Sequence, residues 1–258
     1  VRLHNQLDYS VYNELHAKGV VVGKNNYLYE ENYLKASKGT DFIGHESIKE
    51  KVRKLRRIQD TLAAQNKELV VILCIGKGSY LPEYFPLKWD SIPQGITNYE
   101  VYKQEFNKQG IQYLDFQKWF LQMKDTTPYP LYGKCGIHWS EYGEFLAADS
   151  LLKFSQQILQ TTVAQLKLHD ITLKTKNSDK DYDIGKGLNL LLNNNTYPMA
   201  YPKFNVDRTD DYLGPKGLFV ADSYYWGMFN WGMSRDIFGD GEFWYYNNMI
   251  YPNSYEED

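Results

Sequence analysis

The chain has 258 residues, a formal net charge of −3 and an aromatic content of 16%. This length is sufficient for one large α/β domain with a sizeable core, and we expect a single domain over residues 1–258. The charge gives no basic signature of a nucleic-acid-binding protein, and no stretch approaches the ~20 apolar residues of a membrane span. Because the chain begins at Val1 rather than Met, we expect that an amino-terminal signal peptide or anchor is absent from it.

The amino-terminal half predicts helices alternating with apolar strands. Residues 1–44 are polar and are expected to form an irregular extension, with short strands at 20–22 and 27–29. Apolar residues at three- and four-residue steps predict a helix over 45–67. The continuous apolar run 69–75 is typical of a central parallel strand. Further along we expect helices over 97–109 and 117–124 and a strand over 111–116.

The carboxyl-terminal half continues this alternation. A turn-rich loop over 126–137 precedes a predicted helix over 141–159, and the charged segment 174–183 is expected to be a surface loop. Residues 184–192 and 224–238 are predicted helices, and 217–220 and 242–246 are predicted strands. The alternation favours a three-layer α/β/α fold with a mainly parallel sheet.

The segment Ala221-Asp222-Ser223 closes the apolar run at 218–220. A strand that ends in Asp-Ser and turns into a helix presents the serine hydroxyl at the carboxyl edge of a sheet. The backbone N–H of Ser223 could then stabilise a developing oxyanion. The alternative is that Ser223 only caps the helix that follows.

The segment Gly136-Ile137-His138-Trp139 lies on the loop before a predicted helix. An imidazole in this position can supply the base that a serine nucleophile requires. A structural role for His138 is the alternative. The histidines at 4, 16, 45, 138 and 169 show no metal-ligand spacing, so we expect neither a metal nor another cofactor.

Two cysteines are present. Cys74 lies in the apolar run 69–75 and is expected to be a packed thiol, whereas Cys135 lies on the loop before His138. A disulfide between them is one alternative, and a Cys135–His138 nucleophile pair is another.

Four segments, in this order, resemble the periplasmic alginate O-acetyltransferase family of the SGNH-hydrolase-like group. They are Gly23-Lys24-Asn25-Asn26-Tyr27-Leu28-Tyr29, the stretch 75–86 with Lys77 and Tyr84, Tyr132 to Trp139, and Val220-Ala221-Asp222-Ser223-Tyr224. The resemblance runs over most of the chain. It implies an SGNH-hydrolase-like fold in circularly permuted order, because the serine segment follows the histidine segment.

The resemblance also implies roles for the two segments. Ser223 would be the nucleophile and His138 the general base of an extracytoplasmic, periplasmic carbohydrate O-acetyltransferase that works through a serine acyl-enzyme. The substrate would be a polysaccharide or oligosaccharide, and a membrane-bound partner would supply the acyl group. The alternatives are a carbohydrate esterase of the same chemistry, or a polysaccharide-binding or assembly protein without catalysis.

The chain departs from the family at Gly136, where the family has Asp. A third group normally holds the catalytic imidazole in the correct tautomer. Another acid or a backbone carbonyl could orient His138, or the activity could be weakened. Asp222 is expected to be a structural residue of its turn, and Glu141 lies too far along its helix, so the acid is unassigned.

Other residues are candidates for substrate contact. Lys77 and Gly78 follow the strand at 69–75 and could contribute to an oxyanion hole or bind substrate. Aromatic rings can stack on sugars. The alternative role of these rings is packing in the core. The candidates for stacking are Tyr80, Tyr84, Trp139, Tyr224 and Trp226.

Overall fold

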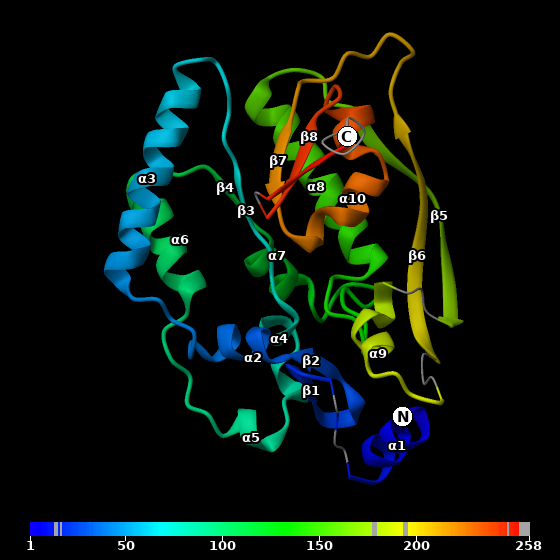
Figure 1. The fold of residues 1–258 in the computed structure, drawn as a ribbon. Coiled ribbons are helices and arrows are strands. Elements are labelled where there is room, and N and C mark those ends of the chain that lie inside the picture. The colour runs from blue at the N-terminus through cyan, green and yellow to red at the C-terminus, as the bar shows by residue number, and fades with distance from the viewer. Residues whose placement is uncertain (13–14, 16, 177–179, 193–195, 247, 253–258) are drawn as a thin grey trace, which may run out of the picture. The chain divides into compact units, whose positions relative to one another are not determined.

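The computed structural model describes residues 1–12, 15, 17–176, 180–192, 196–246 and 248–252 (Figure 1). The chain divides into two compact units. The first comprises Val1–Ser140 and Lys174–Met199, and the second comprises Glu141–Leu173 and Ala200–Asp258. The prediction of one domain over 1–258 stays a prediction.

The first unit contains the histidine loop and most of the described helices. In chain order its elements are α1 (Arg2–Leu7), β1 (Val20–Val22), β2 (Leu28–Glu30), α2 (Glu31–Lys38), α3 (His45–Ala63), β3 (Val71–Leu73), α4 (Lys77–Tyr80), α5 (Leu87–Asp90), α6 (Asn98–Gln109), β4 (Tyr113–Asp115), α7 (Phe116–Met123) and α9 (Asp183–Gly187).

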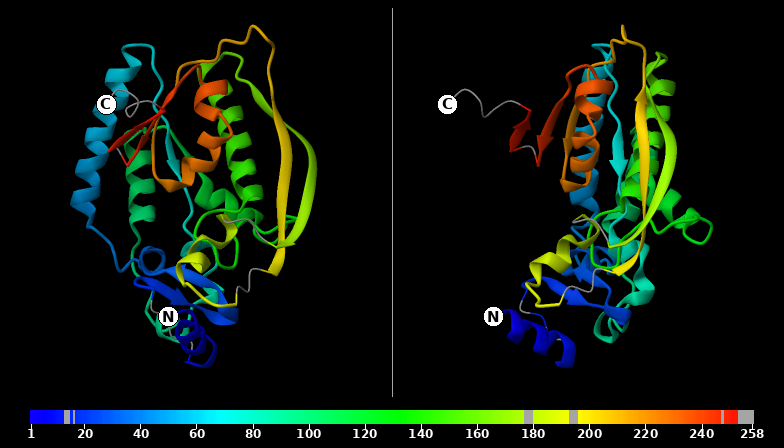
Figure 2. Two further views of the ribbon diagram at one scale, coloured as in Figure 1. Left: turned by 45° about the vertical axis from the view of Figure 1, so that its right-hand side comes forward. Right: turned by 90° about the vertical axis from the view of Figure 1, so that its right-hand side faces the viewer.

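The second unit begins with α8 (Glu141–Leu159). It continues through β7 (Leu218–Ala221), α10 (Trp226–Asn230), β8 (Glu242–Tyr245) and β9 (Met249–Tyr251). Two long strands, β5 (Gln165–Lys176) and β6 (Thr196–Asp207), pair with each other, and both cross from one unit into the other. Figure 2 shows them side by side as a curved ribbon.

Helices α3 and α6 lie side by side, and their packing explains the periodic pattern of the sequence (Figure 1). Ile48 and Val52 of α3 are fully buried against Val101 and Phe106 of α6. Helix α6 begins with a capping box in which Thr97 and Glu100 satisfy each other's backbone N–H groups. The helices predicted over 45–67 and 97–109 are confirmed.

The sheets of the first unit are small. Strands β3 and β4 pair in parallel, with Val71 opposite Tyr113 and Leu73 opposite Asp115. Strands β1 and β2 form an antiparallel pair. Strand β3 runs only from 71 to 73, so the predicted strand over 69–75 is confirmed at its centre and is shorter than expected.

The expectation of an irregular segment over 1–44 is wrong for α1 and for the second half of the segment. Strand β2 leads directly into helix α2, and Leu28, Tyr29 and Leu34 are almost completely buried. The polar residues at 30–32 interrupt the apolar pattern, and they hid the burial of these three. This segment is therefore part of the core of the first unit.

In the second unit, the single helix predicted over 224–238 is broken. A 3₁₀ turn over Ser223–Tyr225 is followed by α10 and then by a π-helix over Met233–Ile237. The break comes at Gly232, whose φ of 86° lies in the left-handed region that only glycine adopts easily. Strands β7, β8 and β9 form a sheet in which β7 and β8 are parallel.

The described strand pairings form four small sheets rather than one large one. The pairs β3–β4 and β7–β8 are parallel. The pairs β1–β2 and β8–β9 are antiparallel. The single mainly parallel sheet and the permuted order therefore stay predictions. Among the described residues, no helix is both long and apolar enough to span a membrane.

Candidate functional site

The loop that carries His138 is closed on itself at its base. Tyr132 and Trp139 form an antiparallel bridge, and the Ser140 amide donates to the Leu131 carbonyl at 2.8 Å. The Trp139 ring packs against two rings of α7, with centroid distances of 6.3 Å to Phe116 and 6.2 Å to Phe120. These contacts hold both ends of the loop and do not involve the side chain of His138.

A carboxylate lies against the imidazole of His138. The Nδ1 atom of His138 is 2.7 Å from Oδ2 of Asp183, and the two side chains are 20% and 29% exposed. The other oxygen, Oδ1, accepts hydrogen bonds from the backbone N–H of Ile137 at 2.8 Å and of Ile184 at 2.7 Å. Asp183 thus holds both the ring of His138 and the backbone immediately before it.

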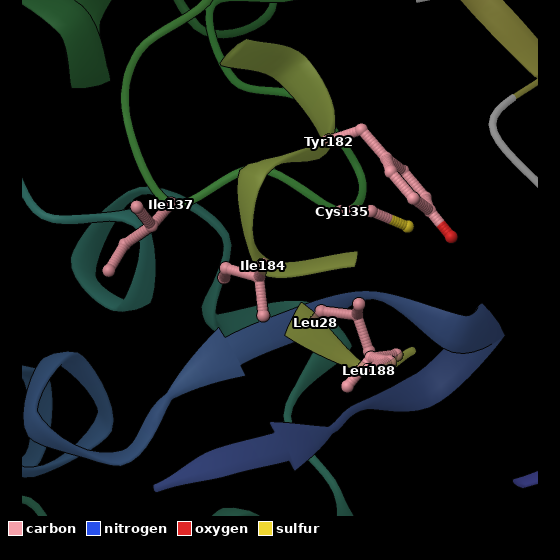
Figure 3. Packing of buried hydrophobic residues seen from close by; sticks show 6 residues of the cluster. All are labelled: Leu28, Cys135, Ile137, Tyr182, Ile184 and Leu188. Atoms are coloured by element: carbon pink, nitrogen blue, oxygen red, sulfur yellow. The ribbon is translucent and has the colours of Figure 1, made fainter. Parts of the chain in front are cut away.

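Hydrophobic packing brings Asp183 to this place. A 3₁₀ turn over Lys180–Tyr182 leads into α9, which begins at Asp183. On either side of Asp183, Tyr182 and Ile184 are buried in a cluster with residues from β2, the histidine loop and the end of α9 (Figure 3). Its buried members are Leu28, Cys135, Ile137, Tyr182, Ile184 and Leu188.

The backbone of this same segment occupies the space beside Gly136. A Cβ atom added at Gly136 would lie 2.9 Å from the carbonyl oxygens of both Lys180 and Asp181, which is closer than real Cβ contacts. An aspartate at 136 would therefore collide with the backbone that leads to Asp183. The glycine in the histidine segment and the acid in α9 are two parts of one arrangement.

Asp183 is not among the residues predicted from the sequence. The segment 174–183 is expected to be a surface loop, and this expectation is wrong over its described end, because Asp181 and Tyr182 are buried. Residues 177–179 lie outside the described residues. The alternation of Tyr182 and Ile184 around Asp183 is the one signal in the sequence that could have indicated a buried segment.

The side chain of Lys77, the first residue of α4, is hydrogen-bonded to the histidine loop. Its side chain is 1% exposed, and its Nζ donates to the carbonyls of Lys134 at 2.7 Å and Gly136 at 2.8 Å. Burial lowers the pKa of Lys77 to about 7, while the charges of Cys135 and Asp183 act in the opposite direction. The enclosed side chain of Lys77 argues against its contact with a substrate, and the assignment of Lys77 to an oxyanion hole stays a prediction.

Gly78 has a packing role in α4. A Cβ at this position would lie 2.3 Å from the backbone oxygen of Tyr33 in α2, so only glycine permits this close approach. Its assignment to an oxyanion hole stays a prediction.

A second carboxyl group lies in the electrostatic field of the pair. Burial raises the pKa of Glu30, the negative charge of Asp183 raises it further, and His138 lowers it. Glu30 ends β2, next to the residues that pack against α9. The histidine and its acid are therefore close to one further titratable group that the sequence did not indicate.

Ser223 lies at the start of the 3₁₀ turn in the second unit and is partly exposed. The helix-capping bond is made by its neighbour, because the Asp222 carboxylate accepts from the Tyr224 amide at 3.0 Å. Asp222 is thus a structural residue of the turn, as expected. The N-cap of this turn is therefore Asp222 and not Ser223.

Neither cysteine forms a disulfide, because both Cys74 and Cys135 are free thiols. Burial is the largest influence on Cys135 and raises the pKa of its thiol, with Lys77 and Lys134 acting against it. A reactive cysteine needs a lowered pKa and access to solvent. Cys135 is buried among apolar side chains, which argues against the Cys135–His138 nucleophile pair.

Most of the aromatic stacking candidates are packed in the core. Tyr80, Trp139 and Tyr224 are almost completely buried, so no ring face is open to a sugar. Trp226 contacts four other rings, with centroid distances between 4.8 and 5.7 Å. Tyr84 stacks on Tyr27 at 3.8 Å and is partly exposed. For the three buried rings, packing is the role that the structure gives.

The geometry in the first unit is that of an oriented general base. A carboxylate can only accept hydrogen bonds, so the contact with Asp183 assigns the proton of a neutral imidazole to Nδ1. The Nε2 atom is then the nitrogen that can take a proton from a substrate or nucleophile. The second unit supplies a serine on a strand-to-helix turn whose cap is made by another residue.

The fold of the chain resembles those of solved proteins. The chain resembles the solved O-acetyltransferase domain of Pseudomonas putida AlgJ, with a TM-score of 0.58, 17% identity and coverage of 88% of this chain and 79% of that one. It also resembles Pseudomonas aeruginosa AlgX, with a TM-score of 0.52 and 18% identity over 88% of this chain. The aligned part spans 54% of the AlgX chain.

At 17% and 18% identity, these similarities show that the chain shares the fold of the two solved structures. No curated protein matches the chain. A family profile described as "SGNH hydrolase-like domain, acetyltransferase AlgX" matches residues 20–219, which is most of the sequence. The chain therefore belongs to this family of SGNH-hydrolase-like acetyltransferases.

Proposed function

We propose that this protein is a polysaccharide O-acetyltransferase in which Ser223 is the nucleophile, His138 the general base and Asp183 the acid that orients His138. The observation that carries the proposal is the 2.7 Å contact between His138 Nδ1 and Asp183 Oδ2. An orienting carboxylate completes a serine–histidine–acid set that the sequence alone leaves without its third member.

The reaction has two halves. Ser223 Oγ attacks the carbonyl carbon of an acetyl donor, His138 Nε2 takes the hydroxyl proton, and the donor's leaving group departs with that proton. The acetyl group is then an ester of Ser223. In the second half a sugar hydroxyl attacks this ester, Nε2 accepts the hydroxyl proton and returns it to Ser223 Oγ. The product is an O-acetylated sugar.

The proposal requires that His138 Nε2, from the first unit, and Ser223 Oγ, from the second, come within hydrogen-bond reach in the active protein. Asp183 stabilises the imidazolium that forms when Nε2 takes the proton. We further propose that the reaction occurs outside the cytoplasm and that a membrane-bound partner supplies the acetyl group. Both points rest on the resemblance of the chain to its family.

The contact between Asp183 and His138 also bears on the alternative that the protein has no catalytic activity. Gly136 was the reason to consider a polysaccharide-binding or assembly protein, because glycine offers no acceptor to the imidazole. Asp183 supplies that acceptor from another element. Glycine at 136 is therefore no argument against activity.

The test is an acetyl-transfer assay with p-nitrophenyl acetate as donor and a panel of unacetylated oligosaccharides as acceptors, read by mass spectrometry. We expect acetylated oligosaccharide with the wild-type protein and none with S223A or H138A. Release of acetate without transfer to any acceptor would favour the esterase. Equal activity of S223A and the wild-type protein would contradict both catalytic functions.

A further inference from the structure

Lys77 is enclosed beneath the histidine loop. It is the first residue of α4, immediately after the short segment that follows β3. Its Nζ lies over the rings of Tyr27 and Tyr29, at 5.7 and 5.3 Å from their centroids. Burial of an amine is costly unless acceptors are provided, and lysine is seldom fully buried without such partners.

The acceptors of Lys77 are in the loop that carries His138. Nζ donates to the carbonyl of Lys134 at 2.7 Å and to that of Gly136 at 2.8 Å. The Lys134 carbonyl also accepts from the Leu28 amide at 3.0 Å, so it is tied to β2 as well. The amine of Lys77 thus fixes two alternate peptide units of the loop.

One of these peptide units is held at both of its ends. The Gly136 carbonyl accepts from Lys77, and the N–H of the same peptide bond, which belongs to Ile137, donates to Asp183 Oδ1 at 2.8 Å. A donor at the oxygen and a carboxylate at the N–H match the direction of the peptide dipole. Hydrogen bonds in such a chain polarise and strengthen one another.

The other oxygen of Asp183 is the one that contacts His138. A sequence of contacts therefore runs from Lys77 Nζ through the Gly136–Ile137 peptide to Asp183, and from Asp183 to His138 Nδ1. All of these residues belong to the first unit. Gly136 suits this arrangement because it leaves room for the 180–181 backbone on its other side.

We infer that Lys77 is a positioning residue for the catalytic imidazole, acting through the Gly136–Ile137 peptide and Asp183. The inference rests on the proposed role of His138 as base. Lys77 touches no reacting atom in this scheme. Its effect is to hold the carboxylate and the loop in the geometry that orients His138, as outer residues do in other preorganised sites.

The experiment compares K77M with K124M. Lys124 is the control. Its Nζ also donates to a backbone carbonyl, that of Tyr80 at 2.5 Å, and also lies over a tyrosine ring, at 5.3 Å; in addition it pairs with Glu83 at 2.8 Å. Two readouts are used. The first is the low-field Nδ1–H signal of His138 in protein with ¹⁵N-labelled histidine, assigned with H138Q. The second is kcat and KM for acetyl transfer.

We expect K77M to lose or broaden the Nδ1–H signal and to lower kcat about tenfold or more, with little change in KM. K124M should keep both. In a double-mutant cycle, D183N should cost less in the K77M background than in the wild type, because both changes break the same chain of contacts.

The inference is overturned if K77M keeps the His138 signal and the kcat of the wild type while losing only stability, as a purely structural lysine would. The NMR readout needs no turnover, so it decides the inference even if the protein proves to have no transferase activity. If K77M does not fold, K77L serves with the same readouts and the same criteria, because leucine also removes the donor to the two carbonyls.

Discussion

His138 and Asp183 are 45 residues apart in the sequence and 2.7 Å apart in the structure. The motif that the histidine segment resembles has its acid two residues before the histidine, on the same loop. Here that position is Gly136, and the carboxylate that contacts His138 comes from the start of α9. The same chemical relationship is thus built from a different part of the chain.

We predict that D183N lowers the rate of acetyl transfer by about 10³- to 10⁴-fold, because an amide no longer selects the tautomer that leaves Nε2 as the base. D149N is the control, since Asp149 forms a surface ion pair with Lys153 on α8. Initial rates at saturating donor give the comparison. A D183N rate close to that of D149N would show that Asp183 does not orient the base.

Asp222 offers a second comparison between acids. We expect D222N to retain most of the activity, because asparagine also caps the turn at Tyr224, whereas D222A should lose about 1 kcal/mol of stability with the cap. Unfolding in urea measures the stability of each variant. A large activity loss in D222N, together with little loss in D183N, would identify Asp222, not Asp183, as the essential acid.

Gly136 is expected to be intolerant of any side chain. In G136A the new Cβ would meet the carbonyls of Lys180 and Asp181, which must move and take Asp183 with them. We predict a stability loss of about 1–3 kcal/mol together with a lower transfer rate.

The control for this substitution is G187A. Gly187 lies in the same short helix as Asp183, and a Cβ there meets nothing within 4 Å. Restored activity in a G136D/D183N double variant would be unexpected, since the 180–181 backbone fills the space that the aspartate needs. Such a rescue would contradict the steric argument, because it would mean that an aspartate fits at position 136.

Lys77 should make the stability of the protein depend on pH. Its pKa is about 7 in the folded protein and 10.5 ordinarily, so between these values the unfolded chain binds a proton that the folded protein does not. Stability therefore rises with pH over this window, by about 2 kcal/mol between pH 7 and pH 9. Below about pH 7 both states hold the proton, and the contribution of Lys77 stays constant.

Tyrosines set the upper limit of this window. Burial raises the pKa of Tyr80 and of Tyr182 to about 12, so above about pH 10 the unfolded chain loses these protons first and stability falls. Urea unfolding of the wild type, K77M and K124M at pH 7 and pH 9 tests the lysine term. K77M should lose the rise and K124M should keep it; a rise that survives in K77M must come from other groups.

The sequence predicted the elements that have strong periodicity. Helix α3 follows from its apolar stripe, and the strand at 218–221 and the histidine loop follow from apolar runs and turn residues. Ser223 and His138 could be proposed because both stand at strand or loop ends in motifs of a known family. These signals are local, so a single segment is sufficient to read them.

The acid and the buried lysine could not be predicted in the same way. Asp183 reaches His138 only because Tyr182 and Ile184 pack into a cluster with residues from β2 and the histidine loop. The charges on 174–181 indicate a solvated loop when they are read alone. Lys77 follows an apolar strand, and the sequence carries no sign that the carbonyls of Lys134 and Gly136 will enclose its amine.

The most direct test of the account is the mass of the protein during turnover, with the modified residue mapped by peptide sequencing. After brief mixing with p-nitrophenyl acetate, we predict a single added acetyl group on Ser223. H138A should not form it, and added acceptor oligosaccharide should remove it from the wild type. Acetylation at another residue, or transfer to acceptor with no acetyl group ever on Ser223, would contradict the account.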